Sequence, residues 1–162
     1  MAKFLFLLLL IGSLHSCSTM MGTAAKPELR TMENIIDFPN LTKDQIYIKS
    51  NTWFVETFTS AKSVIEFSDK EAGKIIGNYI FSYTEGVYTY NVRQTIDVEI
   101  KENKVKMRFS NPMFLTTSGL GQNYNHTSYN ELKTEKGVNR ARMEWIKLMD
   151  AYTKFINKDS NW

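Results

Sequence analysis

The sequence is poor in the residue types that build catalytic and metal centres. It has one cysteine, Cys17, and two histidines, His15 and His126, in 162 residues. A single cysteine excludes disulfides within the chain and thiolate metal clusters. A zinc site needs three or four ligands, and the G-x-S-x-G motif of many hydrolases is missing. We therefore expect no enzymatic activity, no metal and no cofactor.

Charge of one sign and long apolar runs are also scarce. Twenty Lys and Arg stand against 17 Asp and Glu, and the two signs are interspersed along the chain. Nucleic-acid binding needs a basic patch or stripe, so we expect no nucleic acid among the partners. After residue 11 no apolar stretch approaches the length of about 20 residues that a membrane-spanning helix needs. The mature chain is therefore not expected to cross a bilayer.

What the sequence does have, at its beginning, is the pattern of an exported lipoprotein. Lys3 precedes the unbroken apolar run FLFLLLLI at residues 4–11, which is typical of a signal peptide. The tetrapeptide LHSC at residues 14–17 resembles the bacterial lipobox and departs from it at His15, where a small or aliphatic residue is usual. We expect residues 1–16 to be removed and Cys17 to be lipidated. Cleavage elsewhere by the general signal peptidase is the alternative.

Lipidation would place the protein on a membrane surface without inserting it, because only the acyl chains enter the bilayer. Residues 18–26 are small and polar, so we expect a lipidated tether over residues 17–32 and a single domain over residues 33–158. No acidic cluster of the kind that resembles a surface-export signal follows Cys17. The expected location is therefore the cell envelope, at the periplasmic face of the outer membrane.

Hydrophobic periodicity predicts the elements of this domain. Thr42 and Gln45 have the spacing of a capping box, which marks the start of a helix. Period-3.6 patterns predict helices over residues 43–59 and 138–157. Period-2 patterns and turn residues predict strands over residues 33–38, 62–67, 74–83, 87–101 and 104–109.

The strand over residues 87–101 gives the clearest pattern, since apolar and polar residues alternate along it. Its predicted buried row contains Tyr88, Tyr90, Val92, Ile96, Val98 and Ile100. Gln94 interrupts this row, so we expect a polar side chain in the core that is either hydrogen-bonded there or lines a small pocket. In the shorter strand over residues 62–67, Ile65 and Phe67 are expected on one face.

These patterns together predict an α+β fold, with an antiparallel sheet of four to five strands and two helices packed on one face. The stripes that contain Trp53 and Trp145 are expected to meet in one core. The other face of the sheet is expected to be wet, because it carries charged residues. Arg93, Asp97, Glu99, Lys106 and Arg108 lie on that face and are expected to form ion pairs across strands.

Two segments carry a resemblance to a known family. The sequence DKEAGKIIG at residues 69–77 follows the Trp-Phe helix, and the alternating strand from Tyr88 to Ile100 comes next. Together they resemble the bacterial envelope family catalogued as domain of unknown function 4468, over roughly residues 33–156. The resemblance implies a fold like that of the TATA-binding protein, in the order strand, helix, four strands, helix. It implies no activity, substrate or catalytic residue.

The segment of residues 116–137 is predicted to be a long polar loop. Loops of this length are uncommon unless they are functional or disordered, and both alternatives stay open. Tyr124, Asn125, His126 and Tyr129 are its candidate contact residues, because aromatic rings and amides suit adaptable binding. Gln94 is a further candidate. We expect a non-catalytic binding module for an envelope protein or a small ligand; the alternative is a periplasmic hydrolase that uses this loop, with His126 and Ser128.

The lipobox gives the first testable prediction. Substituting Cys17→Ser should abolish acylation and leave the protein unprocessed or soluble, because the modified atom is the thiol sulfur. Intact mass spectrometry of the wild-type mature chain measures the outcome directly. A mature chain that begins at any residue other than an acylated Cys17 would contradict the prediction.

Overall fold

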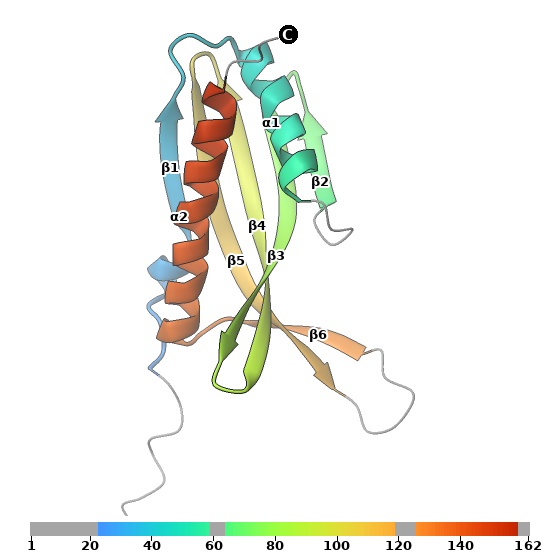
Figure 1. Cartoon of the computed structure of the whole chain (residues 1–162), viewed down its shortest axis with the longest axis vertical. Helices are drawn as coiled ribbons and strands as arrows, with labels where there is room; N and C mark the ends of the chain where they lie inside the picture. The colour runs from blue at the N-terminus through green and yellow to red at the C-terminus, as the bar shows by residue number, and fades with distance from the viewer. Residues whose placement is uncertain (1–22, 59–63, 119–125, 159–162) are drawn as a thin grey trace, which may run out of the picture.

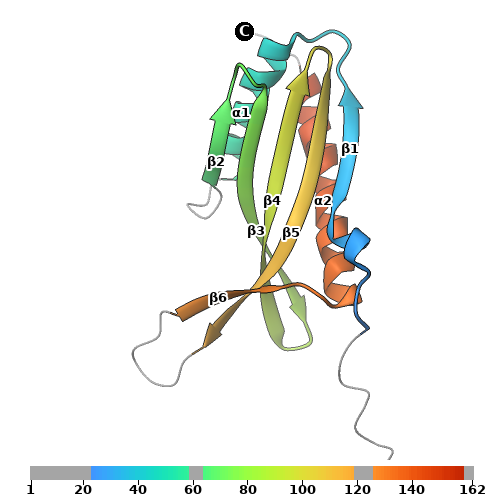
Figure 2. The same cartoon turned by 180° about the vertical axis from the view of Figure 1, so that it is seen from behind.

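The computed structural model describes residues 23–58, 64–118 and 126–158, which fold as one antiparallel sheet and two long helices. The elements in chain order are η1 (Pro27–Arg30), β1 (Met32–Asp37), α1 (Lys43–Thr57), β2 (Val64–Asp69), β3 (Lys74–Glu85), β4 (Tyr88–Lys101), β5 (Lys104–Ser118), β6 (His126–Glu131) and α2 (Glu135–Asn157). Both helices lie on one face of the sheet (Figure 1), and the opposite face is uncovered (Figure 2). The predicted fold class is confirmed.

The sheet has the strand order β1-β5-β4-β3-β2, and β6 is a sixth strand that pairs with β5. The outer edge of β5 has two partners in succession. Its first half pairs with β1, from Asp37 opposite Lys104 to Met32 opposite Phe109. Its second half pairs with β6, beginning with Met113 opposite Glu131. Strand β5 is therefore much longer than the predicted segment of residues 104–109.

Helix α1 begins and packs as its sequence predicts. The Thr42 hydroxyl accepts a hydrogen bond from the Gln45 N–H at 3.3 Å, and the Gln45 side chain accepts one from the Thr42 N–H at 2.9 Å. This capping box satisfies two N–H groups that the first turn leaves free. The helix buries one face against the sheet and α2, with Ile46, Ser50, Trp53 and Phe54.

Helix α2 begins after Thr134, whose hydroxyl accepts a hydrogen bond from the Gly137 N–H. It packs beside α1, where the hydroxyls of Tyr152 and Ser50 lie 2.7 Å apart and the rings of Tyr152 and Trp53 meet edge to face at 5.1 Å. Trp53 and Trp145 belong to the same buried cluster, as predicted. In the part of the chain that the structure describes, no helix is both long and apolar enough to span a membrane.

Two predicted core positions are wrong, because one side chain lies on the other face of the sheet and one is exposed at the end of a strand. Phe67 and Ile65 do not share a face, because the register of β2 shifts between them, and Phe67 is 46% exposed. Tyr88 is not part of the buried row, because β4 begins there, beyond the cover of the helices, and the side chain is 67% exposed.

The predicted loop over residues 116–137 is wrong for most of its length. Strand β5 continues to Ser118, residues 126–131 form β6, and α2 begins at Glu135. The predicted tether is also too long. Residues 23–31 contact the domain, because Ala24 bridges to Thr134 and Ala25 is buried with its N–H bonded to the Lys133 carbonyl at 2.7 Å.

Gln94 lies in the core, fully buried on the inner face of β4. The indole N–H of Trp145 donates to its side-chain oxygen, which confirms the hydrogen-bonded alternative. The side-chain Nε2 has no acceptor among the described residues. The Trp145 ring also stacks on Phe109 at 5.8 Å, so a hydrogen bond and a ring contact together hold α2 against the centre of the sheet.

This contact gives a prediction about stability. Trp145→Phe should lower the free energy of unfolding by about 2 to 4 kcal/mol, because it leaves the Gln94 oxygen buried without a donor and opens a small cavity. Adding Gln94→Leu to that variant should restore part of the loss, since no buried amide remains unpaired. Denaturant unfolding of the two single variants and the double variant measures this coupling. Additive losses would show that the hydrogen bond contributes nothing.

Candidate functional site

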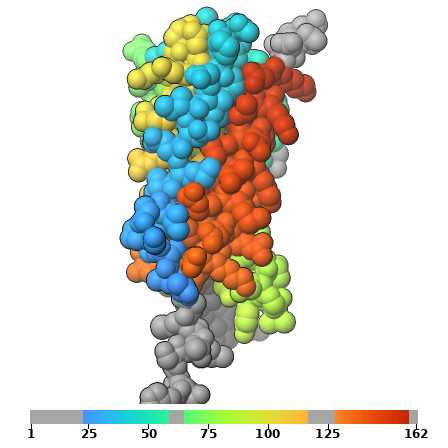
Figure 3. Space-filling model, turned by 90° about the vertical axis from the view of Figure 1, so that its left-hand side faces the viewer, coloured from blue at the N-terminus to red at the C-terminus, as the bar shows by residue number. Residues whose placement is uncertain are grey.

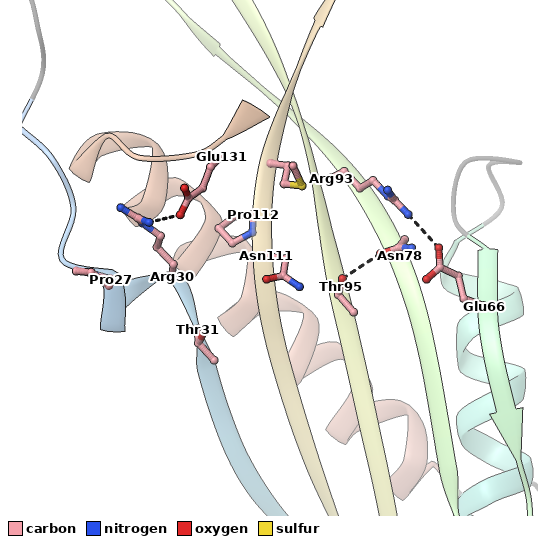
Figure 4. A pocket seen from close by; sticks show the side chains of 11 residues that line it. Pro27, Arg30, Thr31, Glu66, Asn78, Arg93, Thr95, Asn111, Pro112 and Glu131 are labelled. Atoms are coloured by element: carbon pink, nitrogen blue, oxygen red, sulfur yellow. Dashed lines mark hydrogen bonds and ion pairs between the residues drawn. The ribbon is translucent and has the colours of Figure 1, made fainter. Parts of the chain in front are cut away.

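The uncovered face of the sheet contains a cleft of about 650 Å³ (Figure 4). It lies where β5 exchanges one edge partner for the other. The residues that line it come from η1, five strands and the segments next to them: Pro27, Arg30, Thr31, Glu66, Asn78, Arg93, Thr95, Asn111, Pro112, Met113 and Glu131. Segments from both ends of the domain sequence thus meet at one place.

The cleft follows from a break in the pairing of β5. Along β5, the residues paired with β1 end at Phe109 and the residues paired with β6 start at Met113. Neither strand therefore pairs with residues 110–112. Asn111 has a φ of 53°, a left-handed conformation that asparagine tolerates better than most residues. Pro112 has no N–H to donate, which suits a gap in the ladder. This irregularity separates β1 from β6 and opens the face between them.

The floor of the cleft is polar. Asn78 on β3 and Thr95 on β4 are directly opposite in the register, and the Thr95 hydroxyl donates to the Asn78 side-chain oxygen at 3.1 Å. Asn78 is only 8% exposed, although it lies on the face that no helix covers. A buried amide in a cleft can offer its N–H₂ group to a ligand.

Two arginine–glutamate pairs stand at opposite walls of the cleft, as Figure 4 shows. Arg93 of β4 bonds Glu66 of β2 at 2.9 Å, and its guanidinium lies 5.3 Å from the centre of the Tyr129 ring. Arg30 of η1 bonds Glu131 of β6. The buried Nε of Arg30 has no acceptor among the described residues. Each pair holds a guanidinium in place, and Arg30 Nη2 also donates to the Ala25 carbonyl at 3.4 Å.

Beyond the cleft, the same face carries a short network of ion pairs across β3, β4 and β5. Lys74 lies 3.2 Å from Asp97 and 3.4 Å from Glu99, and Lys106 lies 2.8 Å from Glu99. The hydrogen bond to Asp97 raises the pKa of Lys74, and the hydrogen bond from Lys106 lowers the pKa of Glu99. The expected ion pairs are thus present at Asp97, Glu99 and Lys106, whereas Arg108 has no ion pair among the described residues. Asp97 and Glu99 are held by lysines.

The candidate contact residues of the sequence have different outcomes. Tyr124 and Asn125 lie outside the described residues, and of His126 only the backbone is described, at the start of β6. Tyr129 lies on β6, 42% exposed, beside the cleft residue Arg93. Gln94 faces the core on the opposite side of the sheet and does not line the cleft.

The described residues add no support to the hydrolase alternative. The Ser128 hydroxyl lies 2.6 Å from the Thr116 hydroxyl and is also within reach of the Asn130 amide. In residues 23–58, 64–118 and 126–158, His, Asp and Glu side chains do not gather in threes where they could hold a metal ion.

Sequence reasoning missed most residues of the cleft. Arg30 was assigned to the tether. Asn78 lies in a strand on whose wet face a polar residue is expected to be solvent-exposed. The dipeptide Asn111-Pro112 was the available signal, because an Asn-Pro step inside an apolar strand pattern marks a break in the backbone. Nothing in the spacing of the sequence places η1 or β6 beside that break.

Residues 33–114 match the family described as "Domain of unknown function (DUF4468) with TBP-like fold". The chain belongs to this family. The match runs from β1 to the middle of β5 and includes the floor of the cleft. Arg30 and Glu131, which form one wall, lie outside it. The family expected from the segment DKEAGKIIG is therefore confirmed.

Two solved structures share the fold. A DUF4468 family protein from Bacteroides ovatus is 14% identical, with a TM-score of 0.56 over 86% of this chain and 93% of that one. A TBP-like protein from Parabacteroides distasonis is 12% identical, with a TM-score of 0.63 over 84% of this chain and 99% of that one. At these identities the likeness shows the fold alone. No curated protein matches the chain.

The exposed arginine pair of this DUF4468 domain gives a prediction about stability. Arg93→Gln and Glu66→Gln should each change the free energy of unfolding by less than about 1 kcal/mol, because ion pairs between solvent-exposed groups contribute little. Thermal unfolding of both variants tests this. A loss well above 2 kcal/mol would show that the pair holds β2 onto the sheet, and Arg93 would then be unsuitable as a probe of binding.

Proposed function

We propose that the protein is a lipid-anchored envelope lipoprotein whose domain binds a polar partner in the cleft on its uncovered sheet face and catalyses no reaction. The observation that carries this proposal is the cleft itself. It collects hydrogen-bond donors from elements far apart in the sequence at a place where the sheet is irregular. Irregular strands are over-represented near functional sites, because a bulge re-aims side chains.

The donors define the chemistry of the partner. Arg30, Arg93, Asn78 and Asn111 line the cleft, and all of them carry N–H groups. Carboxylates and carbonyl oxygens are the acceptors that guanidinium and amide groups bind best. Glu66 and Glu131 keep the arginines in position and would repel a second anion placed beside them. An acceptor-rich segment of an envelope protein therefore fits better than a free polyanion.

Charge on the uncovered face supports a partner other than nucleic acid. Lys74, Lys106 and Arg93 are each paired with an acidic side chain. Nucleic-acid affinity comes largely from Lys and Arg that are free to neutralise phosphates. Export and lipidation at Cys17 would also keep the domain in the cell envelope, at the periplasmic face of the outer membrane.

Site-specific photo-crosslinking in intact cells tests the binding proposal. A photoreactive phenylalanine analogue replaces Met113, which lines the cleft, and in the control it replaces Ile146, an exposed apolar residue on α2. The cleft position should give a defined crosslinked product that the control position lacks. Adding Arg93→Gln should reduce its yield several-fold, because a charge-assisted hydrogen bond is lost.

The crosslinking experiment can also reject the proposal. Identical products from the Met113 and Ile146 positions would mean that the cleft has no preferred partner. An unchanged yield in the Arg93→Gln variant would mean that the donors of the cleft do not recognise the captured molecule. Hydrolysis of an ester, glycan or peptide by the purified domain would show that the protein is an enzyme and would contradict the proposal of a non-catalytic binding module.

A further inference from the structure

The turn between β3 and β4 exposes apolar side chains. Gly86 occupies the first central position of this two-residue turn with a φ of 60°, a conformation that glycine adopts without strain. Val87 follows it and is 89% exposed, and Tyr88 is 67% exposed. Next to the tip, the rings of Tyr83 on β3 and Tyr90 on β4 stack with centroids 5.1 Å apart, which stabilises the pairing of the two strands.

The N-terminal segment of the described chain lies at the same end of the molecule as this tip. Neighbouring residues of α2 connect the two: the Glu135 N–H donates to the Thr23 carbonyl at 2.8 Å, and Lys136 Nζ lies 2.6 Å from Glu85. Figures 1 and 3 show the N-terminal segment, the start of α2 and the β3–β4 hairpin at one end of the long axis.

Chain length limits how far this end can be from the membrane. Cys17 precedes Thr23 by six residues, and six residues span at most about 20 Å even when fully extended. A lipid on Cys17 therefore keeps Thr23, and with it the hairpin tip, close to the bilayer surface. The turn between β4 and β5 is at the opposite end of β4, whose 14 residues correspond to about 45 Å.

We propose that the hairpin tip, Val87 and Tyr88, enters the interfacial layer of the phospholipid bilayer and orients the domain on the membrane. This proposal rests on the lipid anchor proposed at Cys17. A valine at the apex supplies apolar surface, and tyrosine is suited to the boundary because its ring is apolar and its hydroxyl is polar. The long axis of the domain then stands away from the membrane, with the β4–β5 turn remote from it.

Apolar contact carries this docking, because the charges around the tip nearly balance. Among the described residues at this end, five basic side chains stand with four acidic ones: Lys26, Arg30, Lys133, Lys136 and Arg140 with Glu28, Glu85, Glu131 and Glu135. A cluster of basic residues without acidic neighbours would bind anionic headgroups. This end has no such cluster among the described residues, so docking is expected to be independent of anionic lipid.

Depth-dependent quenching on vesicles tests the proposal. The mature chain carries hexahistidine in place of residues 1–17 and is tethered to phosphatidylethanolamine and phosphatidylglycerol vesicles through a nickel-chelating lipid. A polarity-sensitive nitrobenzoxadiazole label is attached at Thr89→Cys beside the tip, or at Lys104→Cys beside the remote turn. Without Cys17, each variant has one cysteine and is labelled at one site. Because the tether replaces the acyl chains, the result does not depend on lipidation.

Brominated acyl chains should quench the label at residue 89 and leave the label at residue 104 unquenched. The double substitution Val87→Asn and Tyr88→Ser should abolish the quenching at residue 89 and keep the circular dichroism spectrum, because both side chains are exposed. Replacing phosphatidylglycerol by phosphatidylcholine should change nothing.

Four results would overturn the proposal. The first is quenching at residue 89 that is no greater than at residue 104. The second is quenching that survives the double substitution, and the third is quenching that requires phosphatidylglycerol. The fourth is a dimer of the untethered chain that the double substitution converts to a monomer, because the tip would then cover a second copy of the chain.

Discussion

The edge of β5 is the constraint on which the rest of the structure depends. This strand pairs with β4 along one side, while its other side must satisfy backbone N–H and C=O groups with two shorter strands in succession. These two strands leave residues 110–112 without a strand partner on this edge, and the Pro112 carbonyl accepts a hydrogen bond from the Leu132 N–H at 2.9 Å instead. Asn111 and Pro112 fit that gap through a left-handed backbone and a missing donor. The cleft on the open face and the position of η1 both follow from it.

The break at residues 110–112 also affects the face of the sheet that the helices cover. The register between β4 and β5 shifts between Arg93 and Thr95, so Gln94 lies opposite the bulge. A buried amide is costly unless it is hydrogen-bonded, and the indole N–H of Trp145 supplies the bond. The contact therefore joins α2 to the sheet at a point where the apolar row of β4 is interrupted. A single backbone irregularity thus shapes the helix-covered core and the open face.

Most of the core could be predicted from the sequence, because a helix or strand that is buried on one face has apolar residues at regular intervals along the chain. The row Val92, Ile96, Val98 and Ile100 and the helix residues Trp53 and Trp145 were assigned to the core by periodicity, and all are buried. The cleft could not be predicted in this way. Strand β6 has little apolar periodicity, since its residues include Thr127, Ser128 and Asn130, and it forms because β5 offers it an edge. Pairing between distant segments depends on the whole fold and leaves no local pattern.

The likeness to the TATA-binding protein concerns the arrangement of strands and helices, and the charges of the open face favour the proposed polar partner over nucleic acid. Proteins that bend DNA on a sheet use arginines and lysines for the minor groove and insert apolar wedges between bases. Here the arginines of the cleft are held by Glu66 and Glu131, and the lysines further along are held by Asp97 and Glu99. A phosphate backbone would have to break these pairs and would leave carboxylates facing phosphates. The same face offers amide and guanidinium donors at fixed places, which suits a neutral or singly charged polar segment.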